Sequence, residues 1–406
     1  MDASSDTTAL MRYCPLCGSH IGRLLEDLRF AVFDGAPISG RCQLVSCSCC
    51  GFGFYDTPST QADFDRYYEQ NAYYCTATTT GTGGSGAMEL ERFEKLFERF
   101  APSIPKRDPV IIDVGCAKGG LLKVLAHQGF TRLFGVDMVQ DCISYVRNSL
   151  GVQAEVGSAL CLPFPDIRAD VMVYSHVVEH VLDLASLVTA AREKLADGGI
   201  LYVEVPDASK YGIYTANPYQ DLYLEHVNHF DKATLSALFH SGGFVTMSSG
   251  CYDLDVPAGS VPCVWAVFRK GDVAASRPDR VLERHLKGYV EWSRRHPANG
   301  RFARLAAGKV PLYLWGVSQY AMLSLGSSPL RDCNLRGFVD KDPSKRMRTL
   351  LGRPVESPEV IKDAGPHSAV LITAPGYEAP IADELRIMGY AGDILTASGA
   401  TFGAER

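Results

Sequence analysis

The stretch PVIIDVGCAKGGLLKVLAHQGF, residues 109–130, contains the pattern that decides the fold. Its apolar residues 110–114 predict a strand, and a glycine-containing turn and a helical periodicity follow. The next segment, RLFGVDMVQDCI (residues 132–143), predicts a second strand that ends on Asp137. This order of elements is typical of Rossmann-like α/β domains, in which the acid at the second strand's tip accepts hydrogen bonds from a ribose diol.

The turn after the first strand reads GCAKG, residues 115–119. A dinucleotide needs a complete G-x-G-x-x-G turn for its pyrophosphate, so the sequence disfavours NAD-dependent oxidoreduction. The form DVGCAKG, with Asp113 inside the motif, resembles motif I of class I S-adenosylmethionine-dependent methyltransferases. A fold by itself does not establish an activity, and a non-catalytic scaffold is therefore the alternative from another class.

The resemblance extends over roughly residues 85–270. Residues 155–181 match the segment that brackets adenine and the fourth strand, and residues 194–207 match the fifth strand. The resemblance implies that the cofactor is S-adenosyl-L-methionine. It also implies the residues that bind it, which are Asp113, Gly115, Ala117, Gly119, Asp137, Met138, Ser158, Ala159, Ser175 and His176. Glu179 and His180 are expected in the first turn of a helix, where they fasten the backbone.

Six of the thirteen cysteines precede residue 51. Two pairs, CPLC and CSCC, have the C-x2-C spacing of a structural zinc site, and a glycine follows each pair. The expected ligands are Cys14, Cys17, Cys47 and Cys50. Cys49 is an alternative to Cys47 or Cys50, and a cysteine-rich segment without metal is the other interpretation.

The stretch DLYLEHVNHFD, residues 221–231, gathers a tyrosine, a glutamate, two histidines and an asparagine. It precedes a helix that we expect to begin at Asp231 or Lys232 and to end at the glycines 242–243. The cluster therefore lies on the connection that leaves the carboxyl edge of the fifth strand, where ligands bind in open α/β sheets.

The three-part layout resembles that of the zinc-containing sugar C-methyltransferases: a cysteine-rich lobe, a methyltransferase core and a carboxyl-terminal α/β domain. Enzymes of that family methylate nucleotide-linked keto-deoxysugars in antibiotic and glycan biosynthesis. The resemblance implies a Tyr-x-Glu-His element, which matches Tyr223, Glu225 and His226, with His226 as general base. It adds a substrate-contacting tyrosine, Tyr73 or Tyr74. His229 as the base, or a purely structural cluster, remains open. An O- or N-methyltransferase acting on a glycan or natural product is the alternative activity.

The domains expected from these patterns are a zinc-binding lobe (1–75), a methyltransferase domain (76–270), a bridging helix broken by HPANG (271–308) and a Rossmann-like domain (309–406). In the last domain Ser318, Gln319 and a basic group at 341–346 are candidates for nucleotide binding, and a solvated charged face is the plainer interpretation. The Thr/Gly/Ser-rich residues 76–86 are expected to form a mobile linker or lid.

The charge and the hydropathy of the chain argue against nucleic acid and membrane as partners. The net charge of −6 argues against a nucleic-acid protein, and no apolar run is long enough for a membrane span. The polar first residues show no secretory signal, so we expect a cytoplasmic enzyme with reduced thiols and a small-molecule substrate. Nothing in the sequence predicts the oligomeric state.

Overall fold

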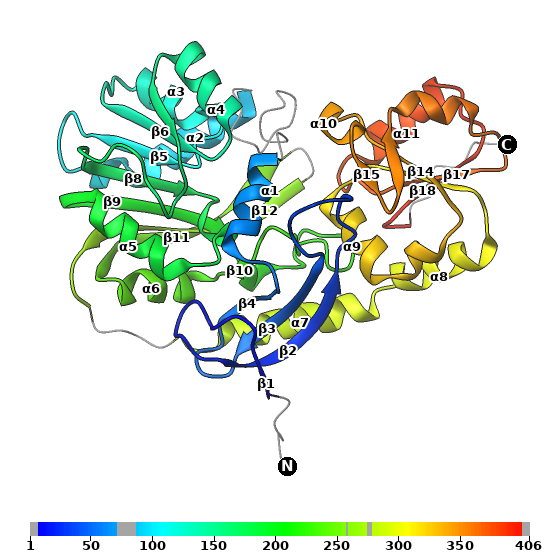
Figure 1. Ribbon diagram of the computed structural model, residues 1–406, viewed down its shortest axis with the longest axis horizontal. Helices are drawn as coiled ribbons and strands as arrows, with labels where there is room; N and C mark the ends of the chain where they lie inside the picture. The colour runs from blue at the N-terminus through cyan, green and yellow to red at the C-terminus, as the bar shows by residue number, and fades with distance from the viewer. Residues whose placement is uncertain (1–6, 71–86, 257–258, 274–277, 400–406) are drawn as a thin grey trace.

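The computed structural model describes residues 7–70, 87–256, 259–273 and 278–399 (Figure 1). Three sheets organise this part of the chain, and Figure 1 shows two α/β units on either side of the blue amino-terminal strands. None of the helices in the described ranges is long and apolar enough to cross a membrane. Tyr73, Tyr74 and the expected linker at 76–86 lie outside the described residues.

The central unit is a seven-stranded sheet in the order β11-β12-β9-β8-β5-β6-β7. Its strands are β5 (Ile111–Val114), β6 (Leu133–Asp137), β7 (Gln153–Val156), β8 (Ala169–Ser175), β9 (Leu195–Pro206), β11 (Phe244–Val256) and β12 (Gly259–Lys270). The pairs among β5 to β9 are parallel, whereas β12 runs antiparallel to both of its neighbours. All four residues of β5 are buried, as expected for a strand covered on both faces.

Helices cover the central sheet (Figure 1). They are α2 (Ala87–Phe100), α3 (Gly120–His127), α4 (Gln140–Tyr145), α5 (Leu184–Lys194) and α6 (Lys232–Ser241). The expected start of α6 is confirmed, because Asp231 caps it and exchanges hydrogen bonds with Thr234. The expectation for Glu179 and His180 was wrong in detail. They lie in a separate 3-10 turn, Val178–His180, because the chain becomes extended again before Asp183 caps α5.

The amino-terminal lobe is a five-stranded sheet in the order β1-β2-β3-β4-β10. Its strands are β1 (Thr7–Ala9), β2 (Ile21–Arg29), β3 (Arg41–Cys47), β4 (Gly53–Asp56) and β10 (Asn228–His229), and the helix α1 (Gln61–Gln70) follows β4. The strand β10 comes from the connection after β9, not from the lobe's own sequence. The segment that carries the histidine cluster is therefore hydrogen-bonded into the amino-terminal lobe.

The carboxyl-terminal unit is a six-stranded sheet in the order β15-β16-β14-β13-β17-β18. Its strands are β13 (Leu312–Trp315), β14 (Leu335–Val339), β15 (Thr349–Leu350), β16 (Arg353–Glu356), β17 (Ala369–Ile372) and β18 (Asp393–Thr396). Its helices are α9 (Gln319–Ser327), α10 (Pro343–Arg346) and α11 (Glu378–Ile387). The pairs β14–β13, β13–β17 and β17–β18 are parallel, which agrees with the expected Rossmann-like unit.

Two helices connect the α/β units, α7 (Val281–Arg295) and α8 (Ala298–Gly308). The expectation of a single bridging helix ended by HPANG was wrong in this respect. His296 and Pro297 do end α7, but the chain re-enters a helix directly after Pro297, because a proline is tolerated at a helix start.

Candidate active site

The turn after β5 forms the floor of the expected cofactor site. Gly115, Ala117 and Gly119 all have positive φ, at 75°, 44° and 73°. A Cβ atom on Gly115 would lie 2.6 Å from Val177 Cγ2, so a larger residue would not fit beneath the turn. The turn leads directly into α3, whose N-cap is Gly119.

Asp137 holds this turn from the tip of β6. Its Oδ2 accepts a hydrogen bond from the Ala117 amide at 2.8 Å, and its Oδ1 accepts one from the Val139 amide at 2.9 Å. The Asp137 carbonyl also accepts a bond from Gly157, at the start of the expected adenine segment. The structure thus brings Asp137, Met138, Ser158 and Ala159 to the same edge as the turn. In that segment Ser158 Oγ accepts hydrogen bonds from the amides of Leu160 and Cys161, and Ala159 is buried.

Asp113 is buried at the carboxyl half of β5. Burial and the nearby charge of Asp137 raise the pKa of Asp113 to about 7, while the Arg92 guanidinium opposes this rise. Desolvation disfavours the charged form of a carboxyl group, so Asp113 changes charge near neutral pH.

Ser175 and His176, at the end of β8, belong to a polar network that sequence reasoning missed. Its centre is Glu204 on β9, which is fully buried. Glu204 Oε1 accepts from Ser175 Oγ at 2.7 Å, and Arg92 Nη2 donates to Ser175 Oγ at 3.0 Å. Glu204 Oε2 accepts from the hydroxyl groups of Tyr202 and Tyr252. A buried charge needs this many partners, and the network fixes the end of β8.

His176 itself is strained and charged. Its φ is 54°, and its Nδ1 lies 3.2 Å from Glu179 Oε1. Burial opposes its positive charge, but the contacts with Cys263 and Glu179 prevail and raise the pKa of His176 to about 10. His176 is thus a cation at neutral pH and not a candidate base.

His226 lies in a cluster that joins the ends of β8 and β9. Its ring is 4.8 Å from the rings of His180 and Tyr223, measured between centroids. A carboxylate oxygen of Glu179 and one ring nitrogen each of His180 and His226 lie within 4.8 Å of one another. Burial, together with the three neighbouring histidines at 180, 229 and 176, lowers the pKa of His226 well below its ordinary value. His226 is therefore neutral at pH 7, and the same lowering makes its imidazole a weaker base than a free one.

Glu225 connects three parts of the chain. Its Oε1 accepts a hydrogen bond from the Tyr67 hydroxyl at 2.8 Å and another from Gln319 Nε2 at 3.0 Å. Tyr68, the next residue on α1, has its hydroxyl 2.8 Å from His180 Nδ1. Sequence reasoning missed Tyr67, Tyr68 and Gln319 as neighbours of the cluster. The resemblance placed a tyrosine near this cluster only at position 73 or 74.

His229 is fully enclosed, as expected for a packed connector. It lies in β10, where it pairs with Gly53 of β4. The Tyr211 hydroxyl is 3.2 Å from His229 Nδ1, and burial lowers the pKa of His229 to about 3. Its neighbour Asn228 is also buried and donates to the carbonyl groups of Val178 and Val181. These two residues attach the cluster to the lobe.

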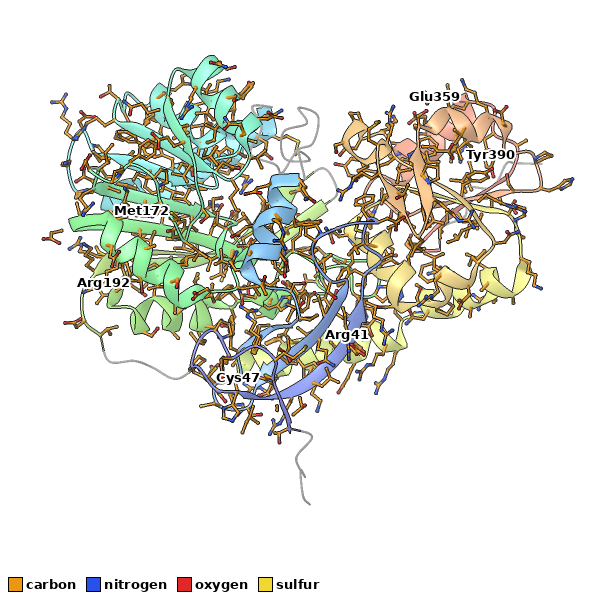
Figure 2. All side chains as sticks on the ribbon, in the orientation of Figure 1. Arg41, Cys47, Met172, Arg192, Glu359 and Tyr390 are labelled. Carbon is orange, nitrogen blue, oxygen red and sulfur yellow. The ribbon has the colours of Figure 1, made fainter. Side chains whose placement is uncertain are left out.

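The four cysteines expected to bind zinc come together in the amino-terminal lobe, where Figure 2 labels Cys47. Their Sγ atoms lie within 4.8 Å of one another, with 3.6 Å between Cys14 and Cys50 and 3.5 Å between Cys17 and Cys47. Tetrahedral bonds of about 2.3 Å to one ion would place the sulfur atoms roughly 3.8 Å apart, so the geometry fits zinc.

The two cysteine turns have the same local form. Gly18 and Gly51 have φ of 71° and 76°, and each donates its amide hydrogen to the carbonyl of the first cysteine of its pair. Cys49 is exposed and lies outside the sulfur cluster, so the structure favours Cys47 and Cys50 over it. No open position would remain on an ion held by four thiolates, which indicates a structural role.

The candidate nucleotide-binding residues of the carboxyl-terminal unit have partners within the chain. Ser318 caps α9, and its hydroxyl donates to the Thr373 carbonyl. Lys345 Nζ lies 3.1 Å from Asp340 Oδ2, and Lys341 pairs with Glu384. These contacts agree with the plainer interpretation of the basic group.

Comparison with known proteins identifies the central unit. A family model described as a methyltransferase domain matches residues 87–249. This match, together with the relatives below, supports a class I S-adenosylmethionine-dependent methyltransferase domain over residues 87–249. The match begins with α2 and includes the cofactor turn, the end of β8 and the histidine cluster, and it supports an enzyme of this kind.

Two relatives of this chain are described as probable S-adenosylmethionine-dependent methyltransferases. A probable S-adenosylmethionine-dependent methyltransferase of Mycolicibacterium smegmatis is 27% identical over 211 residues, which are 47% of this chain and 79% of the relative. One of Mycobacterium tuberculosis is 27% identical over 182 residues, covering 42% of this chain and 62% of the relative. The solved CcbJ methyltransferase of Streptomyces caelestis aligns with 50% of this chain and 98% of its own, at 14% identity and a TM-score of 0.38.

Proposed function

We propose that this methyltransferase transfers a methyl group from S-adenosylmethionine to a carbon atom of a nucleotide-linked keto-deoxysugar, with His226 as the general base. The observation that carries the proposal is the position of His226. Its imidazole lies at the carboxyl edge of the sheet, in contact with His180 and Tyr223, and its lowered pKa keeps it unprotonated at pH 7. A base that works beside a ketone must be unprotonated near neutral pH.

The proposed proton transfer uses residues of one connection. His226 takes the proton from the carbon next to the ketone, and the electron pair moves onto the ketone oxygen to form an enolate. The Tyr223 hydroxyl is the proposed donor to that oxygen, since charge that develops during the reaction needs a positioned hydrogen-bond donor. Burial raises the pKa of Tyr223 to about 12, so the phenol keeps its proton at neutral pH and can act as a hydrogen-bond donor. Glu225 is proposed to orient either His226 or a sugar hydroxyl.

The cofactor residues fit S-adenosylmethionine, which supplies a methyl group already activated on a sulfonium. Asp137 would accept hydrogen bonds from the ribose, and the turn at 115–119 would pass beneath the amino-acid part. Ser175 and His176, fixed by the Glu204 network, would line the side nearest to His226. The chain's contribution is then to align the acceptor carbon with the methyl group.

Three parts of the chain meet at Glu225, next to the place proposed for the methyl acceptor. Glu225 contacts α1 through Tyr67 and α9 through Gln319. A substrate larger than the reacting ring would thus lie between the methyltransferase domain and the carboxyl-terminal unit. A nucleotide-linked sugar has such a size, and this supports the proposed substrate class. Zinc on the four thiolates is proposed as a structural ion.

The test combines methyl-labelled S-adenosylmethionine with a panel of nucleotide-linked keto-deoxysugars and detects the product by carbon NMR. We expect a carbon-bound methyl signal, and we expect the His226→Asn variant to lose roughly 10²- to 10⁴-fold in rate, as is typical when a general base is removed. A His240→Asn variant, altered on the partly buried far end of α6, is the matched control. A methyl signal on oxygen or nitrogen would contradict the proposal.

A further inference from the structure

Arg12 connects the amino-terminal lobe to both histidine-bearing segments. It lies two residues before Cys14, in the loop that follows β1. Its Nη2 donates to the Leu182 carbonyl at 2.7 Å and to Asn228 Oδ1 at 2.8 Å. Its Nη1 donates to the carbonyls of Val227 and Tyr55 at 3.2 and 3.3 Å. One guanidinium group therefore joins three segments that are distant in sequence.

The acceptors of Arg12 flank the histidine cluster. Val227 follows His226 directly, and Leu182 comes two residues after His180. Asn228 extends the connection, because its side-chain amide donates to Val181 at 2.7 Å and to Val178 at 3.3 Å. The 3-10 turn that carries His180 is thus held at both ends by the Arg12–Asn228 pair.

Arg12 is itself held by the lobe. The Asp56 carboxylate, at the end of β4, accepts bonds from the amides of Met11 and Arg12 at 3.0 and 2.7 Å. The guanidinium carbon lies 5.4 Å from the centre of the Phe54 ring, at cation–π distance. The backbone then enters the first cysteine turn, where Cys14 donates its amide hydrogen to Ser19. The position of Arg12 consequently depends on the loop that the sulfur cluster closes.

We propose that Arg12 is a positioning residue for the methyltransferase reaction and that it transmits the order of the cysteine loop to His226 and His180. This proposal rests on the proposed role of His226. A planar group with five donors is suited to the task, since it holds several carbonyls at fixed angles, which a lysine cannot reproduce. The cysteine lobe then has a catalytic consequence although none of its thiols contacts the cluster.

The test compares Arg12→Ala and Arg12→Lys with a matched control, Arg23→Ala. Arg23 lies in the same lobe, is 47% exposed at its side chain and pairs with Glu283 on the surface. The full chain is labelled at the histidine imidazole carbons, and the signals of His180 and His226 are identified from His180→Gln and His226→Asn. Zinc content and the affinity for S-adenosylmethionine are measured on the same samples.

In Arg12→Ala we expect the signals of His180 and His226 to shift while those of the exposed His127 and His367 stay in place. Zinc content should be unchanged and the cofactor affinity should stay within about twofold, because the turn at 115–119 is not touched. With an accepted substrate, kcat should fall roughly 10- to 100-fold at unchanged KM for the cofactor, the loss typical of a misplaced catalytic group. Added guanidinium should restore the signals, and Arg12→Lys should be intermediate.

Unchanged histidine signals in Arg12→Ala would overturn the proposal. So would a joint loss of zinc and cofactor binding in both Arg12 variants that guanidinium does not restore, since this would assign Arg12 to general stability. The histidine signals do not depend on which atom is methylated. A failure of carbon methylation and a failure of the Arg12 role are therefore separate results.

Discussion

Two carboxyl groups of the cofactor turn, only one strand apart, differ in how they respond to pH. Burial raises the pKa of Asp137, and the hydrogen bonds from the amides of Val139 and Ala117 oppose this rise. Asp113 is more deeply buried, feels the charge of Asp137, and has its pKa raised to about 7. The carboxyl group of Asp113 therefore changes its charge within the physiological range.

We predict that the affinity for S-adenosylmethionine rises between pH 6 and pH 8. The sulfonium is positive and favours the ionised form of Asp113, so raising the pH through about 7 should strengthen binding by roughly five- to tenfold. By the same linkage, binding below pH 7 should release a proton. Calorimetry in buffers of different ionisation enthalpy measures both effects.

The control for this prediction is Asp113→Asn, which should bind with little dependence on pH, and the exposed Asp108→Asn should behave like the wild type. If the wild-type affinity were constant from pH 6 to 8, or if Asp113→Asn kept the same slope, Asp113 would not be the responsible group. In the protein without cofactor the raised pKa has the opposite effect: stability should decrease as pH rises through 7, because the folded state then loses its protonated carboxyl group.

Single residues were predictable where a local pattern surrounds them. Asp137 follows an apolar strand, and the cysteines occur in spaced pairs, so their roles could be expected from sequence. Arg12, Gln319 and Glu204 act through partners 94 to 216 residues away or across neighbouring strands. Such contacts cannot be predicted from local periodicity, because they depend on how the sheets are assembled.

At the scale of elements, the approach of α9 to β2 connects the carboxyl-terminal unit to the amino-terminal lobe. Ser327 Oγ donates to the Arg29 carbonyl and accepts from the Arg29 amide, at 2.8 and 2.7 Å. A Cβ atom on Gly326 would lie 1.8 Å from the Arg29 carbonyl oxygen. The neighbour is backbone and cannot rotate away, so only glycine permits this contact.

We predict that Gly326→Ala lowers the free energy of unfolding by about 1–3 kcal/mol, the usual cost of forcing an extra atom into a packed interface. Gly288→Ala is the matched control, since Gly288 also lies in a helix and a Cβ atom there meets nothing within 4 Å. It should be neutral or stabilising by up to about 1 kcal/mol. Denaturant titration of both variants measures the difference, and equal effects would contradict the proposed close packing.

The elements show what periodicity can and cannot predict. The strands β5 and β6 were expected from their apolar runs, β8 and β9 from the family resemblance, and the start of α6 at Asp231 or Lys232 from helix-start signals. β10 was not expected. It is a two-residue strand whose existence depends on pairing with β4, about 170 residues earlier in the chain.

At the scale of the whole molecule, the amino-terminal lobe contacts both α/β units. It receives β10 from one and packs β2 against α9 of the other, and α7 runs along it (Figure 1). A lobe with so few strands buries little core of its own, so a metal ion would contribute substantially to its stability.

We predict one zinc ion per chain in the purified protein, lost in Cys47→Ser and retained in Cys49→Ser. The cysteine at 49 lies outside the sulfur cluster, which makes it the control. Loss of the ion should lower the midpoint of thermal unfolding by roughly 5 °C or more, since metal binding is coupled to folding. Elemental analysis and calorimetry measure these outcomes. Full metal content in Cys47→Ser would contradict the assigned ligands.

The arrangement of the three sheets was only partly predictable. The order of elements predicted two Rossmann-like units and a cysteine lobe, and the structure has sheets in each of these regions. Their mutual contacts bring α1, α9 and the connection after β9 together at Glu225. The sequence singled out Glu225 and Gln319 for separate reasons, and Tyr67 looks like an ordinary helix residue, so nothing in composition or spacing indicated that the three would meet.

The central claim is that His226 removes a proton from carbon, and deuterium exchange tests it most directly. The enzyme is incubated in D2O with S-adenosylhomocysteine and a nucleotide-linked keto sugar that it methylates, and the proton next to the ketone is followed by NMR. We predict that this proton exchanges with the wild type and that His226→Asn slows the exchange by roughly 10²- to 10⁴-fold. Methyl transfer without any such exchange in the wild type, or equally fast exchange in His226→Asn, would contradict the account.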